Sequence, residues 1–268
     1  MFGRSFYSKD RAGKATKPSK RSFREHTKLK MQQSLNSPPV GSTLTSPIIT
    51  LLVGPEQRVF AAHEDVLCLS PFFAAALKGQ FYETHAKKVA LPDEVPEIFS
   101  CVLEYLYKGD YYPRLLHNKR HNSWELEDAQ DPHKLGGRGS VESTIYHPAV
   151  GGDLLKDTAI YCAADKFGLE ELKRLALRKQ GLQSGIQVEV IIRSARYAYE
   201  NTPDSDSRLR AHFLALIIRS RKIFKRSGTM QMEMELGGSK LFFDLFVAMC
   251  SHVDDIIEVT NKSSPRTI

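Results

Sequence analysis

The order of apolar and polar residues near the start of the regular pattern predicts a small β-sheet. Residues 48–53 form an apolar, β-rich run, residues 54–57 have turn chemistry, and residues 58–62 form a second run. Two such runs around a four-residue turn are typical of a β-hairpin. Residues 87–91 alternate between polar and apolar and predict a third strand.

Two helices are expected in the first half of the chain. Ser70 suits an N-cap, Pro71 suits the first helical position, and Gly79 ends the apolar segment between them. A longer helix is expected to begin near Pro96, carry apolar residues on one stripe, and end before Gly109.

Helical spacing returns in the second half and predicts that this half is all helical. The expected helices are 154–179, split by Gly168, then 186–200, 207–224 and 240–258.

Residues 114–150 interrupt this pattern and are rich in glycine, proline and histidine. The stretch is therefore expected to be a polar insertion in a surface loop. His117, His121, His133 and His147 lie in it without cysteine partners or a supporting helix, so we expect no metal site there.

The basic charge of the chain is concentrated near its beginning. Residues 1–30 hold ten Lys or Arg and two acids, a net charge of +8, whereas the other 238 residues hold 28 Lys or Arg and 29 acids, a net charge of −1. Residues 1–46 are therefore expected to be a disordered basic tail. The neutral remainder argues against a dedicated nucleic-acid surface across the folded part.

Other features narrow the class of protein. The chain has no apolar run long enough for a membrane span and does not begin with a secretory signal. Its four cysteines are far apart and lie in apolar helical patterns, which predicts reduced core thiols. We expect an intracellular protein of the cytoplasm, the nucleus or both.

Three ordered motifs resemble the BTB/POZ domain. The residues that carry the resemblance are His63, Leu67, Ser70, Phe72, Tyr107, Gly109, Ala163, Asp165 and Lys166. Lys108 replaces a threonine common in the family, at a position expected to face solvent. The segment 199–210 is similar to the one that follows the BTB domain in BTB proteins of filamentous fungi.

The resemblance implies an α+β fold in which a small β-sheet packs with a helical cluster and is followed by C-terminal helices. We expect a tail at 1–46, a BTB/POZ domain at 47–182 and a helical extension at 183–268. His63 is expected to be a buried histidine bonded to backbone groups, and Asp165 with Lys166 a surface or helix-end pair.

The implied function is non-enzymatic protein–protein interaction by an adaptor or scaffold that needs no cofactor. Phe81, Tyr82 and Glu83 follow the first helix, where BTB adaptors of cullin ubiquitin ligases carry a hydrophobic-x-Glu motif, so a cullin is a candidate partner. Homodimerisation stays open. The alternative is a nuclear regulator that contacts nucleic acid through the basic tail or the cluster 219–226.

Overall fold

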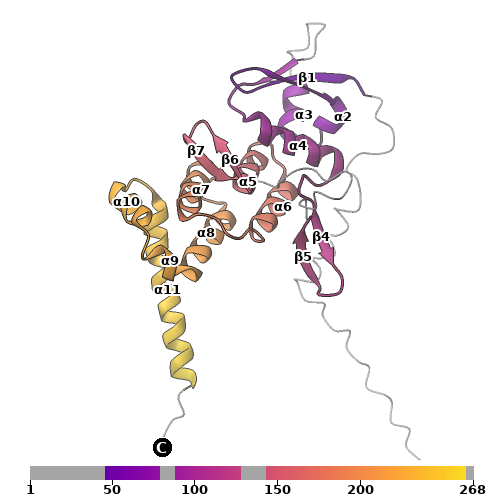
Figure 1. Cartoon of the computed structure of the whole chain (residues 1–268). Coiled ribbons are helices and arrows are strands. Elements are labelled where there is room, and N and C mark those ends of the chain that lie inside the picture. The colour runs from indigo at the N-terminus through magenta and orange to yellow at the C-terminus, as the bar shows by residue number, and fades with distance from the viewer. Residues whose placement is uncertain (1–45, 79–87, 128–142, 264–268) are drawn as a thin grey trace, which may run out of the picture.

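The structure, a computed structural model, describes residues 46–78, 88–127 and 143–263. It belongs to the α+β class, as predicted (Figure 1). The basic tail at 1–45 lies outside the described residues. Among the described helices, none has both the length and the hydropathy that crossing a membrane requires.

A three-stranded sheet forms one side of the first half. Strand β1 (Ile48–Val53) is central, with β2 (Arg58–His63) antiparallel on one edge and β3 (Lys88–Leu91) parallel on the other. Val53 lies opposite Arg58, and Leu51 lies opposite Val89. Alternate side chains of β1 are buried.

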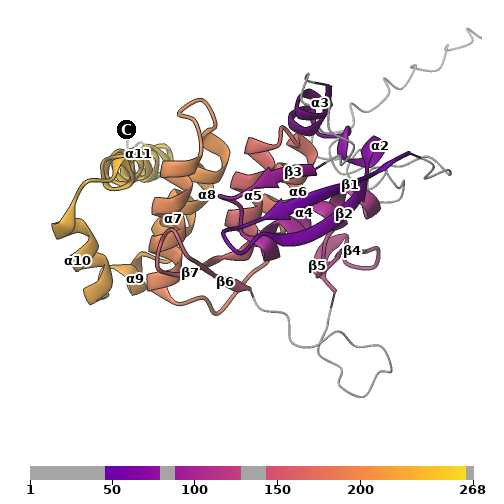
Figure 2. The ribbon, with the colours of Figure 1, turned by 90° about the horizontal axis from the view of Figure 1, so that it is seen from above.

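Three helices accompany this sheet, one directly beneath its strands and another beyond its β3 edge (Figures 1 and 2). They are α2 (Glu64–Leu67), α3 (Pro71–Lys78) and α4 (Pro96–Lys108). The expected stripe of α4 is buried, and Gly109 ends the helix in the left-handed conformation, with φ 73°. Its N–H donates to the Tyr105 carbonyl at 2.7 Å.

The prediction that residues 114–150 form a surface loop is wrong for the described part of that range. Four short strands form two hairpins: β4 (Leu115–Asn118) with β5 (Ser123–Leu126), and β6 (Thr144–His147) with β7 (Gly152–Leu155). Leu115 and Trp124 turn inward and are buried, which anchors the first hairpin to the core. The backbone N–H of Leu155 donates to Ser194 Oγ at 2.8 Å, which ties the second hairpin to a later helix.

The second half is helical apart from these hairpins. Its helices are α5 (Lys156–Lys166), α6 (Glu170–Gln180), α7 (Val188–Asn201), α8 (Ser207–Arg219), α9 (Arg221–Phe224), α10 (Gly228–Leu236) and α11 (Lys240–Ser263). The helix expected at 207–224 breaks at Ser220 into α8 and α9, and α10 was not predicted. Figure 1 shows α5–α8 gathered beside α4, while α11 runs away from the body.

The four cysteines carry free thiols, but not all of them are core residues. Cys101 and Cys162 are buried, Cys68 is half-buried, and Cys250 is exposed on α11. Burial raises the pKa of the Cys162 thiol well above its usual range. The expectation of a core thiol is therefore wrong for Cys250.

Candidate functional site

The His63 side chain joins the sheet to the central helix. Its ring Nδ1 lies 2.8 Å from the Tyr107 hydroxyl, and its backbone N–H donates to the same hydroxyl at 2.9 Å. The ring is only half-buried, so its partner is a phenol at the end of α4 instead of the backbone groups we expected. Two predicted signature residues, His63 and Tyr107, thus meet in one contact.

Ser70 performs the predicted capping role and also reaches the second half of the chain. Its Oγ accepts from the Phe73 N–H at 3.5 Å and donates to the Phe167 carbonyl at 2.7 Å. The Phe167 ring stacks on Phe73 with centroids 5.2 Å apart. Gly168 has φ +69°, and a Cβ there would lie 3.2 Å from the Pro71 ring, so a side chain would disturb this junction.

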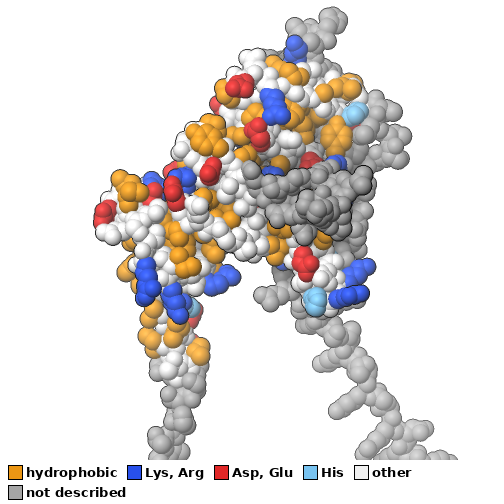
Figure 3. Space-filling model, viewed as in Figure 1, with side chains coloured by type: hydrophobic (Ala, Val, Ile, Leu, Met, Phe, Trp, Pro, Cys, Tyr) orange, Lys and Arg blue, Asp and Glu red, His pale blue; other side chains and the backbone are white. Residues whose placement is uncertain are grey.

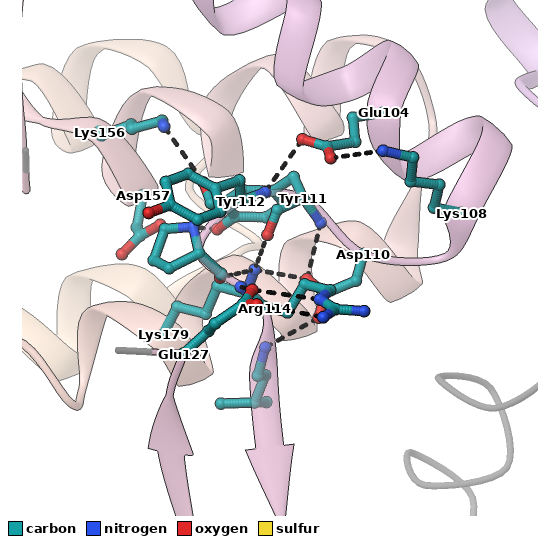
Figure 4. Close-up of polar contacts among 12 residues, drawn as sticks. Glu104, Lys108, Asp110, Tyr111, Tyr112, Arg114, Glu127, Lys156, Asp157 and Lys179 are labelled. Carbon is teal, nitrogen blue, oxygen red and sulfur yellow. Dashed lines mark hydrogen bonds and ion pairs between the residues drawn. The ribbon is translucent and has the colours of Figure 1, made fainter. Parts of the chain in front are cut away.

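A buried polar network lies where α4, α5 and α6 meet (Figure 4). Lys179 is fully buried, and its ammonium donates to the Asp110 carboxylate and to the carbonyls of Tyr111 (2.5 Å) and Pro113 (2.7 Å). Asp110 also accepts from the backbone N–H groups of Tyr111 (2.7 Å) and Leu115 (2.8 Å). All three donors of the ammonium are used, as a buried cation requires.

The same network continues through Tyr111 to Asp157. The Tyr111 hydroxyl donates to Asp157 at 2.6 Å, and the Gln183 amide donates to the second carboxylate oxygen at 3.2 Å. Burial raises the pKa of Asp157 and lowers that of Lys179, although their partners act in the opposite direction. Because these groups are enclosed and bonded to one another, the network acts as a structural joint.

The edge of the network is accessible to solvent. Arg114 and Glu127 form a two-pronged ion pair, with Nε and Nη2 each 3.1 Å from a carboxylate oxygen. Glu104 accepts from the Tyr112 N–H and from Lys108, both at 3.0 Å. These contacts hold the chain that leads from α4 into the first hairpin.

Asp165 and Lys166 point to different partners, so they do not form a pair with each other. Lys166 donates to Glu94 at 2.5 Å, while Asp165 accepts from Lys173 at 2.5 Å. Lys173 also pairs with Asp206 at 2.7 Å, which links α5, α6 and the start of α8. Ala163, the neighbouring signature residue, is buried in the core.

The ion pairs that join Lys173 to Asp165 and Asp206 shift the pKa values of Lys173 and Asp206. Burial of Asp206 would raise the pKa of its carboxyl, but hydrogen bonds from Lys173 and Tyr161 outweigh burial and hold the pKa below its usual range. Burial would lower the pKa of Lys173, but bonds to Asp165, Asp206 and Glu170 raise it. The ionised forms therefore stabilise each other.

The outer surface of the C-terminal helices is apolar and basic in adjoining areas (Figure 3). The large exposed apolar residues there are Ile223, Met232, Met234, Leu236, Phe243, Phe246, Val247, Met249, Val253, Ile256, Ile257 and Val259. All five cations of the 219–226 cluster are also exposed: Arg219 at the end of α8, and Arg221, Lys222, Lys225 and Arg226 in and just after α9. A surface of this composition suits macromolecular contact.

Four residues named in the sequence analysis lie outside the described residues. They are Phe81, Tyr82 and Glu83, which fall between α3 and β3 in the sequence, and His133, which falls between β5 and β6. Within the described ranges, no group of three or more His, Cys, Asp or Glu could hold a metal ion.

Sequence reasoning missed the Lys179 network and the exposed stripe on α11. The signal for the first was a lysine placed on the apolar stripe of α6, seven residues after the buried Leu172. A charge in that position is buried only if it has a partner.

Comparison with known families matches one segment in the first half of the chain. Residues 49–119, from β1 to just beyond β4, match the family model of the BTB/POZ domain. BTB domains mediate protein–protein interaction and homodimerisation. No curated protein matches the chain. The match includes six of the nine predicted signature residues, from His63 to Gly109; the other three, Ala163, Asp165 and Lys166, lie beyond its end.

Proposed function

We propose that this chain is a non-catalytic adaptor that holds protein partners, and that one partner is the scaffold of a cullin-type ubiquitin ligase. The observation that supports the proposal is the BTB/POZ match over residues 49–119. A BTB domain is an interaction module, and the Lys179 and Asp157 side chains of the polar network are buried and bonded to other protein groups.

The proposal assigns a domain at 47–182 and a helical extension at 183–268. The family match ends before α5, yet Ser70 and Asp110 take partners from Phe167 and Lys179. Buried bonds of this kind join α5 and α6 to the matched segment. A partner held by one part would therefore be kept in a fixed position relative to the other.

The proposed cullin contact is the segment Phe81, Tyr82 and Glu83. It joins α3, which ends at Lys78, to β3, which begins at Lys88. Phe81 could fill an apolar pocket, and the Glu83 carboxylate, two positions later, could accept a hydrogen bond at the pocket rim. The sequence resemblance supports this assignment.

The test is capture of a cullin scaffold by the purified full-length chain. The double change Phe81→Ala and Glu83→Ala should weaken binding by about thirtyfold or more, since an aromatic anchor contributes at least ~2 kcal/mol. The thermal transition should stay nearly unchanged. The control is Leu116→Ala with Glu125→Ala, a partly exposed apolar–acid pair on the β4–β5 hairpin, which should bind like wild type.

Equal capture by wild type and the Phe81/Glu83 variant, or no capture by wild type, would remove the cullin from the proposal and leave a general scaffold. Unfolding of the variant would mean that Phe81 is a packing residue.

A second candidate function is supported by the exposed cations Arg221, Lys222, Lys225 and Arg226. Four cations beside one short helix could neutralise DNA phosphates. In that case the logarithm of affinity should fall with the logarithm of salt concentration by roughly 0.9 per phosphate. Changing all four to glutamine should remove both DNA binding and its salt dependence. Failure of the wild type to bind DNA at low salt would exclude this function.

A further inference from the structure

The last helix leaves the body of the protein after its first turns. Leu241 and Leu245 are buried, and Asp244 accepts from the Tyr199 hydroxyl at 2.9 Å. From Met249 to Thr260 every residue is exposed. Figure 1 shows this part of α11 extending well beyond the neighbouring helices.

The exposed part carries a regular apolar seam. Phe242, Phe246, Met249, Val253, Ile256 and Thr260 follow one another at alternating steps of four and three residues. This is the heptad spacing that keeps one face of a helix against a second helix. The seam continues along the helix after its contacts with the body have ended.

The apolar area is large enough for a specific interface. Phe243, Phe246, Met249, Val253, Ile256 and Ile257 are each 44–70% exposed. At 65–70% exposure each phenylalanine presents roughly 100–170 Å², because an aromatic side chain buries roughly 150–250 Å². With the four smaller side chains the helix presents roughly 500 Å² in each copy, so two copies would bury about 1,000 Å², the area that marks a specific protein interface.

The distribution of charge favours a second copy of this chain as the occupant. Asp254, Asp255 and Glu258 lie on the opposite face, so two seams can meet without like charges opposing each other. The polar face of α11 has no lysine or arginine between residues 241 and 261. Helices that lie on anionic membranes carry such cations, so a lipid surface is disfavoured.

We infer that α11 is a self-association helix that pairs with α11 of a second copy through the seam Phe246, Met249, Val253, Ile256 and Thr260. The contact lies outside the BTB/POZ match and does not depend on the proposed cullin contact. It adds a second interface, at the far end of the molecule from the three-stranded sheet.

The experiment measures distances between copies of the full chain. A spin label is placed at Ser251→Cys on the polar face of α11, with Cys68 and Cys250 changed to serine; the other two thiols are buried. Since paired helix axes lie about 8–10 Å apart, labels on their outer faces should be separated by roughly 20–35 Å.

Two matched substitutions show whether that distance depends on the seam. Val253→Asp places a carboxylate in the seam and should weaken association by at least about tenfold, because the charge would be buried without a partner. Val247→Asp makes the same change on another face of α11, where Val247 is 46% exposed, and should keep the distance. Both valines are at least 46% exposed, so the helical content of both variants should match wild type by circular dichroism.

If Val253→Asp leaves the distance between the two spin labels unchanged, the inference is overturned. It is also overturned if wild type shows no such distance at any concentration up to its solubility limit. A dimer held only through the BTB domain would have twice the monomer mass but would lack the label distance that depends on the seam. That result would also overturn the inference. If α11 does unravel in Val253→Asp, Ile256→Gln provides the same test with a good helix former. Cullin capture by Val253→Asp should equal wild type, so failure here is distinguishable from failure of the proposed function.

Discussion

Lys179 connects the two halves of the chain through a single side chain. Its ammonium is fully buried and reaches Asp110, 69 residues earlier in the sequence. The Tyr111 ring also lies beneath the ammonium, with Nζ 3.5 Å from the ring centroid. Removing one member of such a pair leaves the other charge buried and alone, which costs more than the pair contributed.

The change Lys179→Met should therefore destabilise the fold by about 3–5 kcal/mol. It leaves the Asp110 carboxylate without its cation and two carbonyls without donors. Urea unfolding at neutral pH measures the loss. Lys108→Met is the control, since that exposed pair with Glu104 contributes only about 0.3–0.5 kcal/mol. A loss below about 1 kcal/mol for Lys179→Met would contradict the assigned network.

Asp206 should make the free energy of unfolding depend on pH in the acidic range. Its folded pKa lies below the unfolded value of 3.8, so its stabilisation is complete above that value and is lost as pH falls through the lower folded pKa. Asp206→Asn should cost about 1.5–3 kcal/mol near pH 7, and the difference from wild type should shrink below about pH 4.

Unfolding in urea at a series of pH values measures the effect of Asp206→Asn. Asp255→Asn, which changes an exposed carboxylate on α11, is the control and should alter stability little at any pH. A difference between wild type and Asp206→Asn that stays constant from pH 7 to pH 3 would show that the Lys173 contact does not hold the carboxylate ionised.

At the scale of elements, Trp124 attaches the β4–β5 hairpin to helix α6. Trp124 is 8% exposed and lies between the His117 ring, at a centroid distance of 4.8 Å, and the Arg178 guanidinium, 5.3 Å from its centroid. Arg178 belongs to α6 and lies 54 residues after Trp124 in the sequence, so the hairpin is attached to a helix from a later part of the chain.

Trp124 is the only tryptophan of the chain, so its fluorescence reports on this contact alone. Arg178→Ala should expose the indole, shift its emission to longer wavelength and increase quenching by acrylamide, with a stability loss of about 0.5–2 kcal/mol. Arg174→Ala, one turn earlier on the exposed face of α6, should leave the spectrum unchanged. Identical spectra for all three proteins would mean that the hairpin is held in another way.

Elements with local signals were predictable, and those defined by distant partners were not. Gly109 and Gly168 marked the helix ends that the structure has, and the β1–β2 hairpin followed from its apolar runs and turn. Strands β4–β7 have four residues each and owe their order to residues such as Arg178 and Ser194. Helix α10 has methionines on several faces, so no apolar stripe indicated it.

For the candidate site, individual residues could be predicted from the sequence, but the contacts between them could not. His63 and Tyr107 were recognised separately from a family resemblance, but their contact was not, because it depends on how β2 lies against α4. The proposed partner segment at Phe81, Tyr82 and Glu83 stays a prediction. The seam of α11 could have been found from its spacing, whereas its exposure could not.

At the scale of the whole molecule, buried and partly buried bonds over long sequence separations join the family-matched segment to the later helices. Ser70 and Phe167 are 97 residues apart, and Glu94 and Lys166 are 72 residues apart. The basic N-terminal residues contribute little apolar area that could offset the entropy of ordering them.

Deleting residues 1–45 should therefore leave the melting temperature within a few degrees of wild type. Differential scanning calorimetry measures it. Deleting residues 1–50 is the control, because it removes half of β1, including the buried Ile49, and should prevent folding. A large drop in melting temperature or soluble yield for the shorter deletion would show that the tail packs against the body.

The ring of Phe167 has a consequence for how the protein is made. On the ribosome the BTB/POZ segment emerges first, yet Phe73 and Phe99 lack their contacts with Phe167 until α5 has been synthesised. Asp110 waits longer, for Lys179, 60 residues after the match ends at residue 119. At about 5–20 residues per second this interval lasts roughly 3–12 seconds. A ribosome-stalled chain ending near residue 120 should be digested rapidly by protease, whereas one long enough to release α6 from the ribosome should resist it.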